Sequence, residues 1–249
     1  MKKMVMLAAG VVFLFVSSAH AAVEDRVLKD WTRSGDYTES GGGQQVRIRV
    51  TYYSAEYIEA LVRSEAEKNL WTEDEEERYR YNLLRTLDLE DRVAFHFDFN
   101  VMGTPVYLQP FDRHLKLYAG KKVLEPVDYD KRFNFKLQGQ RDGMVWFPRY
   151  DEKTGKSLLN GVKDLRLIIN GSISQATTRA GDVRFVWDIS KDDPSTLNRG
   201  TAAARLEMDR LIKRVDKLRA DRAKLQEQLN VIDKELNEVD NRVGELQRQ

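Results

Sequence analysis

The side chains in this sequence that are best suited to chemistry are its few histidines and its many carboxylates. His96 and Asp98 stand two residues apart in a segment that alternates between apolar and polar residues, so a β-strand would place both on one face as half of a metal site. A third ligand would have to come from elsewhere, such as His114. The polar outer face of an ordinary sheet has the same pattern, and we therefore expect no metal-binding residues.

Carboxylates are abundant enough for a hydrolase that uses two of them as acid and base. The chain has 40 Asp and Glu residues, however, so such pairs also arise by chance. No serine lies in a nucleophile-elbow sequence. The segment 153–157 is similar to a phosphate-binding loop, but Tyr150 stands where that motif needs its first glycine. We expect no catalytic residues and no cofactor.

Aromatic side chains offer another activity, the binding of carbohydrate or peptidoglycan on an exposed platform. The chain has no cysteine, so disulfides and thiolate metal sites are excluded and its core depends on burial alone. We therefore expect most of the aromatic residues to be buried. The candidates for a platform are Tyr52, Tyr53, Trp71, Tyr107, Phe111, Tyr118, Trp146 and Tyr150.

The N-terminus has the pattern of a secretory signal peptide over residues 1–21. Two lysines precede the apolar segment 5–16, and small residues at Ala19 and Ala21 predict cleavage after Ala21. About a dozen apolar residues are too few for the roughly 20 of a transmembrane helix. We expect a periplasmic or secreted protein without a stable membrane anchor after cleavage.

The balance of charge excludes some classes of partner. Lys and Arg number 41 and Asp and Glu 40, so the composition lacks the concentrated basic excess of a nucleic-acid-binding protein. The overall charge gives no indication of binding to a membrane surface either.

Alternating apolar and polar residues predict a β-sandwich domain over 46–190 that folds without the tail. The alternation is clearest in 46–52 and 93–101, and two inserted helices are expected at about 54–88, where Thr72 and Glu75 form a capping box. We interpret 22–45 as a flexible arm and 191–200 as a linker. Shorter strands are centred on Lys116, Phe135, Trp146, Leu167 and Phe185.

Part of this β region resembles secreted bacterial telokin-like immunoglobulin domains, over about residues 93–173. The resemblance implies an immunoglobulin-like sandwich and an extracytoplasmic binding or structural module with no known chemistry. It supplies no functional residues. The segments that carry it are Phe97, Leu115-Lys116-Leu117-Tyr118, Gly120-Lys121-Lys122, Leu124-Glu125-Pro126, Val145-Trp146-Phe147-Pro148 and Leu165-Arg166-Leu167-Ile168-Ile169.

The tail, residues 201–249, has the clearest pattern in the sequence. From Ala204 onward, apolar residues recur in alternating steps of four and three over about six heptads, which is typical of a long α-helical coiled coil. Only Arg222 interrupts the apolar seam. The predicted interface consists of Met208, Leu211, Val215, Leu218, Arg222, Leu225, Leu229, Ile232, Leu236, Val239, Val243 and Leu246.

The charges beside the seam disfavour a parallel homodimer. In that arrangement Arg214 would face Arg219 of the partner helix, and Glu235 would face Asp240. Both contacts join like charges. Arg222 would also face its own copy.

An antiparallel homodimer avoids these contacts in the register that aligns Arg222 with Leu225. That register pairs each a position of the heptads on one helix with a d position on the other. It leaves no contact between like charges. A helix of another envelope protein and the chain's own β-domain are the alternative partners. The opposite-charge pairs are Arg214 with Glu235, Glu207 with Arg242, and Arg205 with Asp240.

Taken together, these patterns predict a mainly β, immunoglobulin-like sandwich with two inserted helices and a C-terminal coiled coil. The expected function is that of a non-catalytic structural or interaction protein of the cell envelope, in which the sandwich binds a component and the tail oligomerises. The alternatives are a carbohydrate- or peptidoglycan-binding module and an envelope hydrolase that uses paired carboxylates.

Overall fold

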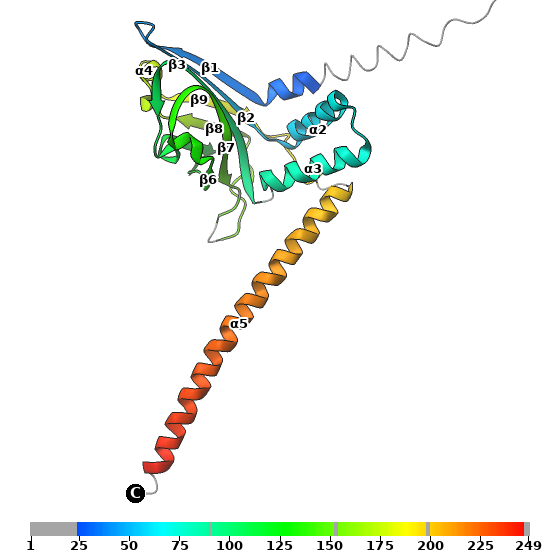
Figure 1. Ribbon diagram of the computed structural model, residues 1–249, viewed down its shortest axis with the longest axis vertical. Helices are drawn as coiled ribbons and strands as arrows, with labels where there is room; N and C mark the ends of the chain where they lie inside the picture. The colour runs from blue at the N-terminus through cyan, green and yellow to red at the C-terminus, as the bar shows by residue number, and fades with distance from the viewer. Residues whose placement is uncertain (1–23, 90, 152–153, 198–199, 247–249) are drawn as a thin grey trace, which may run out of the picture. The chain divides into compact units, whose positions relative to one another are not determined.

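The computed structural model describes residues 24–89, 91–151, 154–197 and 200–246, in two compact units that divide between Arg199 and Gly200. The first unit contains two antiparallel sheets and several helices, which confirms the prediction of a mainly β domain with inserted helices (Figure 1). The second unit is helix α5 (Gly200–Leu246). The predicted signal peptide, including the cleavage site at Ala21, lies outside the described residues.

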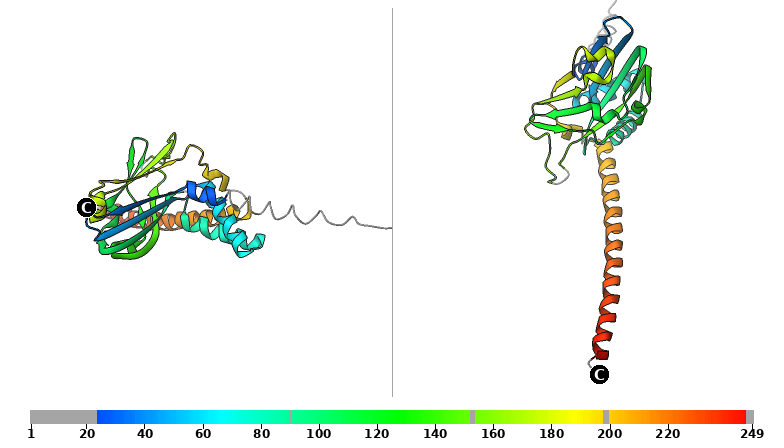
Figure 2. Two further views of the ribbon diagram at one scale, coloured as in Figure 1. Left: turned by 90° about the horizontal axis from the view of Figure 1, so that it is seen from above. Right: turned by 90° about the vertical axis from the view of Figure 1, so that its left-hand side faces the viewer.

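The two sheets form two layers whose inward side chains share one hydrophobic core (Figure 2). Sheet A has the strand order β1 (Thr32–Thr38), β2 (Gln44–Tyr52), β3 (Arg92–Tyr107), β7 (Lys136–Pro148) and β6 (Asp128–Tyr129). Sheet B has the order β5 (Lys122–Leu124), β4 (Leu115–Ala119), β8 (Asp164–Ile169) and β9 (Val183–Asp188). Short helices connect the strands: η1 (Phe111–His114), η2 (Lys131–Asn134), η3 (Gly171–Ile173), α4 (Gln175–Thr178) and η4 (Pro194–Leu197).

Strand β3 shows how the alternating pattern produces the core. Alternate side chains along a strand point to opposite faces, so one set of β3 is buried in full. Phe97 and Phe99 make edge-to-face contacts with Phe111, with ring centroids 5.8 and 5.9 Å apart. The buried set, confirmed as predicted, is Val93, Phe95, Phe97, Phe99 and Val101.

The shorter predicted strands are mostly present. Lys116, Leu167 and Phe185 lie in β4, β8 and β9, and Trp146 lies near the end of β7. Phe135 does not lie in a strand. It follows η2 and is exposed, because the chain makes a turn there before β7 begins.

The two inserted helices are confirmed as α2 (Ala55–Asn69) and α3 (Glu73–Leu87). The Ser54 hydroxyl accepts a hydrogen bond from the backbone of α2, and the Glu75 carboxylate accepts one from the Thr72 N–H at 2.9 Å. The guanidinium of Arg80 on α3 bonds to Glu59 on α2 and joins the helices. The Trp146 indole donates to the Leu87 carbonyl at 3.1 Å, which holds this hairpin against sheet A.

The flexible arm predicted over 22–45 is wrong for the part that the structure describes. Residues 24–30 are helical, and β1 pairs with β2 along its whole length. The sequence conceals this strand because its inward positions are Arg33, Gly35 and Tyr37 rather than regular apolar residues. The Arg33 side chain donates to the Val186 carbonyl of β9 at 3.0 Å and so joins the two sheets at this edge.

The predicted linker over 191–200 is also wrong in part, because residues up to Leu197 pack on the domain. Asp192 accepts hydrogen bonds from the Tyr52 hydroxyl and from the Ala55 N–H, the latter at 2.8 Å. Burial raises the pKa of Asp192, although Tyr52, Ala55 and Arg149 favour its charged form. Leu197 is only 4% exposed. The domain therefore extends beyond the predicted bounds of 46–190 at both ends.

A bend in β3 predicts a strong effect of one small substitution. Gly103 has φ +83°, and a Cβ built there would lie 2.0 Å from the Gly43 carbonyl oxygen. Gly103→Ala should therefore lower the free energy of unfolding by roughly 2–5 kcal/mol. Gly139 is the matched control, because it also has positive φ (+70°) but open space around it. We expect Gly139→Ala to lower the free energy of unfolding by about 1–2 kcal/mol, as measured by urea unfolding. Equal losses in the Gly103→Ala and Gly139→Ala proteins would contradict the predicted clash at Gly103.

Candidate functional site

The two residues of the predicted half of a metal site each contact a different partner on sheet A. His96 and Asp98 do share the outer face of sheet A, but His96 Nε2 lies 3.0 Å from Asp142 Oδ2 and Asp98 lies 3.7 Å from the Arg49 guanidinium. His114 lies apart from them, in the η1 turn that leads into sheet B. No group of three potential ligands is found among the residues that the structure describes.

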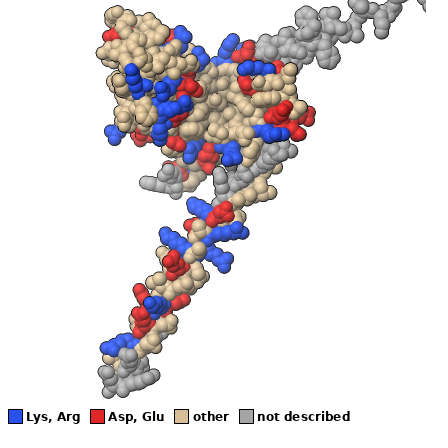
Figure 3. All heavy atoms as spheres, viewed as in Figure 1, with Lys and Arg blue, Asp and Glu red and all other residues tan. Residues whose placement is uncertain are grey.

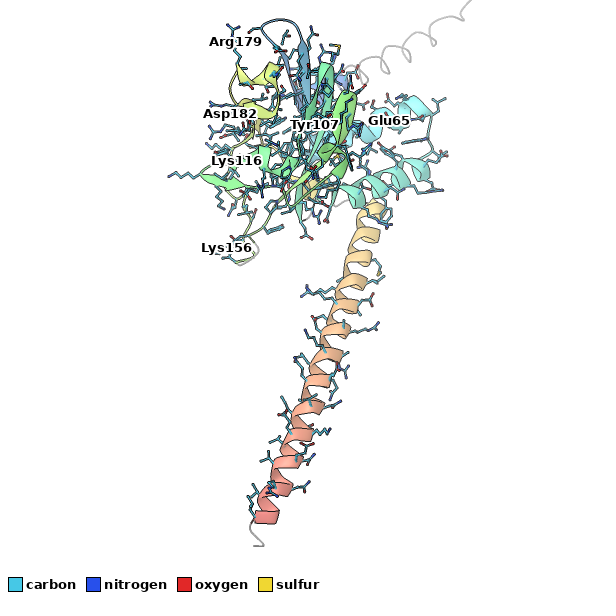
Figure 4. All side chains as sticks on the ribbon, turned by 60° about the vertical axis from the view of Figure 1, so that its left-hand side comes forward. Glu65, Tyr107, Lys116, Lys156, Arg179 and Asp182 are labelled. Carbon is cyan, nitrogen blue, oxygen red and sulfur yellow. The ribbon has the colours of Figure 1, made fainter. Side chains whose placement is uncertain are left out.

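Two carboxylates, Asp98 and Asp142, lie opposite each other on β3 and β7, but Arg49 and His96 already contact them. Burial raises the pKa of Asp192, whereas hydrogen bonds lower the pKa of Glu75, Asp130 and Asp188. Asp192 is already bonded to Tyr52 and to the start of α2. Figure 4 shows that charged side chains such as Glu65 and Asp182 lie on opposite sides of the domain.

The candidate aromatic platform is also dispersed. Tyr52 and Phe111 are core residues, and the Trp146 indole is bonded to α3. Tyr107 and Tyr150 are exposed, but Tyr107 ends β3 whereas Tyr150 follows β7 near the opposite end of that strand pair. Of the others, Tyr118, Tyr53 and Trp71 are half-buried. No flat group of exposed rings results.

Helix α5 carries the clearest candidate site, the seam predicted from its heptads. Every α5 side chain whose burial is described is exposed. The apolar members of the seam are 44–64% exposed, although such residues are usually buried in folded proteins. The described seam residues are Met208, Leu211, Val215, Leu218, Arg222, Leu225, Leu229, Ile232, Leu236, Val239, Val243 and Leu246.

The seam is continuous because its spacing matches the turn of the helix. Residues three and four apart lie on the same face of a helix, so the set forms one narrow stripe. Ile212 is 52% exposed beside the stripe and widens it, a contribution that the strict heptad pattern missed.

The charges beside the seam are only partly used within the helix. Arg219 lies 3.8 Å from Asp216, an ion pair between residues one turn apart. Arg214 and Glu235 make no ion pair with any described residue of the chain, so both are available to a second helix. The side chains of Arg205, Glu207 and Asp240 lie outside what the structure describes.

A long apolar stripe with free charges at its borders is suited to helix–helix contact rather than to catalysis. Among the described residues, no helix combines the length and the apolar composition that a membrane span requires. Comparisons of the chain with models of protein families, with curated proteins and with solved structures give no match, so its function has to be argued from its own surfaces.

Proposed function

We propose that this protein is a non-catalytic interaction protein of the bacterial cell envelope, in which α5 forms an antiparallel coiled-coil homodimer and the β-domain binds an envelope component. The observation that carries the proposal is the exposed apolar seam of α5, whose flanking charges match a second copy of the same helix. The signal-peptide pattern of residues 1–21 supports export.

The bounds of α5 fit the antiparallel register. Alignment of Arg222 with Leu225 also places Thr201 opposite Leu246, so two copies overlap along nearly the whole helix. At 1.5 Å per residue, the paired rod would be about 70 Å long. Each Leu or Ile buried in the seam contributes roughly 1.5–3 kcal/mol of hydrophobic stabilisation. The seam therefore supplies the affinity.

The flanking charges supply the orientation. The antiparallel register pairs Arg214 with Glu235 twice by symmetry, and it also separates the two Arg222 side chains along the rod. A parallel pair would place Arg222 against itself in the middle of an apolar seam, where an unpaired charge is costly. The antiparallel orientation is thus favoured because the parallel form must bury two Arg222 charges against each other and bring like charges together.

We also propose an immunoglobulin-like classification for the β-domain. The segments that resemble telokin-like domains fall on regular elements: Leu115–Tyr118 in β4, Leu165–Ile169 in β8, and Gly120 in the β4–β5 turn with φ +60°. Two antiparallel sheets around one core are consistent with this class. An immunoglobulin-like class would imply that the β-domain is a binding module.

Single cysteines test the orientation directly, because the natural chain has none. In the antiparallel register Val215 lies opposite Ile232. A mixture of full-length Val215→Cys and Ile232→Cys proteins should therefore give a crosslinked heterodimer with a short thiol crosslinker, whereas Val215→Cys alone should stay uncrosslinked. In a parallel dimer, Val215 faces its own copy and the single variant would crosslink.

Sedimentation of the same proteins separates the remaining alternatives. A monomer at all concentrations would overturn self-association and leave a helix of another protein or the β-domain as the partner of the seam. Lys217→Cys, on the far side of the helix, is the control for random collision and should not crosslink.

A further inference from the structure

We propose that the outer face of sheet B docks on a surface of anionic lipid. The proposal rests on the suggested role of the β-domain as the part that binds the envelope, and it does not depend on the dimer. Alternation along β4, β8 and β9 directs one set of side chains into the core and the other set outward. The outward set is Lys116, Tyr118, Arg166, Ile168, Arg184 and Val186.

Cations and apolar side chains alternate on this face. One row across the strands runs from Lys116 through Ile168 to Arg184. The next row runs from Tyr118 through Arg166 to Val186, and the Arg166 guanidinium carbon lies 5.1 Å from the centre of the Tyr118 ring. The strand register thus places each apolar group beside at least one cation.

The cations of sheet B differ from those of sheet A in having no acidic partner. On the outer face of sheet A, Arg47 lies 2.6 Å from Asp36 and Arg49 lies 3.7 Å from Asp98. Lys116, Arg166 and Arg184 form no ion pair with any described carboxylate. Their charge is therefore available to a ligand.

Acidic residues lie beyond both ends of the two rows, and at one end Asp182 stands two residues before Arg184. Asp164 and Asp188 are opposite each other across β8 and β9, in the row beyond Arg166. The two rows of cations and apolar groups therefore contain no carboxylate from β4, β8 or β9. The acidic residues thus border the positive area but do not pair with its cations.

The overall composition conceals this positive face. The net charge of the chain is only +1, but α2 and α3 together carry nine acidic and five basic residues. Figure 3 shows acidic side chains gathered over that hairpin. Figure 4 shows that Lys116 lies on the side of the domain away from Glu65 of α2. The two ends of the domain therefore differ in charge, and an anionic surface would orient it.

The shape of the face favours a lipid surface over a small ligand. Small molecules bind in concave pockets, whereas this face is one side of a sheet. Val123 and Val186 are 50% and 47% exposed beside the cations. A bilayer offers a matching arrangement, with phosphates at its surface and apolar chains below. The geometry therefore selects a flat, anionic, partly apolar partner.

Vesicle co-sedimentation of the full chain tests the proposal. Wild-type protein should bind vesicles of phosphatidylcholine mixed with phosphatidylglycerol more tightly than vesicles of phosphatidylcholine alone. The excess should disappear near 1 M salt, where the screening length falls to about 3 Å. Lys116→Glu combined with Arg184→Glu should lower the partition coefficient at least about tenfold, since each surface cation contributes roughly a factor of five.

The control carries the same charge change at another place. Lys68→Glu combined with Arg85→Glu reverses two exposed cations of the α2–α3 hairpin, and this protein should bind as the wild type does. The N-terminal apolar segment is identical in all these proteins, so differences between them report on sheet B. Equal binding to both vesicle types, or an equal loss in the protein with Lys68→Glu and Arg85→Glu, would overturn the proposal. Either failure would leave the crosslinking test of the dimer unaffected.

Discussion

Replacement of Arg214 by glutamate is expected to weaken the α5 dimer by about 1–3 kcal/mol, roughly 5- to 150-fold in Kd. The change replaces an attraction to Glu235 by a repulsion, and the symmetry of the dimer makes the effect occur twice. The second substitution Glu235→Arg should restore the affinity, because the pair then has opposite charges in the reverse order. Sedimentation equilibrium of the full-length proteins measures both changes.

The sign of this effect distinguishes the two orientations. In a parallel dimer, the new carboxylate at position 214 would meet Arg219 of the partner and strengthen association. Lys217→Glu introduces the same charge at an exposed position outside the seam and should change Kd little. A tighter dimer in the Arg214→Glu protein would therefore show that the helices run parallel.

A chain that ends at Ser190 is expected to lose about 2–5 kcal/mol of unfolding free energy relative to one that ends at Arg199. The shorter chain lacks Asp192, whose carboxylate accepts the Ala55 N–H at the start of α2, and it lacks the buried Leu197. Such a loss is a large part of the stability of an ordinary domain. Urea unfolding of the two truncated proteins measures it.

Two further proteins divide this loss between its causes. Asp192→Ala in the chain that ends at Arg199 should reproduce the part due to the helix cap, and Leu197→Ala the part due to burial. If the chains ending at Ser190 and Arg199 unfold at the same urea concentration, residues 191–199 contribute nothing to the stability of the domain.

The local signals in the sequence predicted the elements that depend on neighbouring residues. Ser54 and the pair of Thr72 and Glu75 start α2 and α3 because each cap needs residues only three positions apart. The alternation in β3 identified its buried face for the same reason. Heptad spacing likewise identified the stripe on α5, because that stripe follows from the turn of the helix alone.

Features that depend on distant residues could not be predicted in the same way. Asp192 meets Tyr52 across 140 positions of sequence, and no local pattern indicates that contact. Strand β1 was missed because its stability comes from pairing with β2 and from the contact between Arg33 and Val186. The unpaired cations of sheet B became visible only when the register placed Lys116 and Arg184 in one row.

The packing of Asp192 and Leu197 on the domain has a mechanical consequence. Leu197 is buried and α5 begins at Gly200, so only two residues of sequence separate the packed part of the domain from the helix. A pull along α5 would therefore load the hydrogen bonds of Asp192 to Tyr52 and Ala55 before any core strand. Under such tension the start of α2 would lose its contacts with Asp192 before load reaches β9.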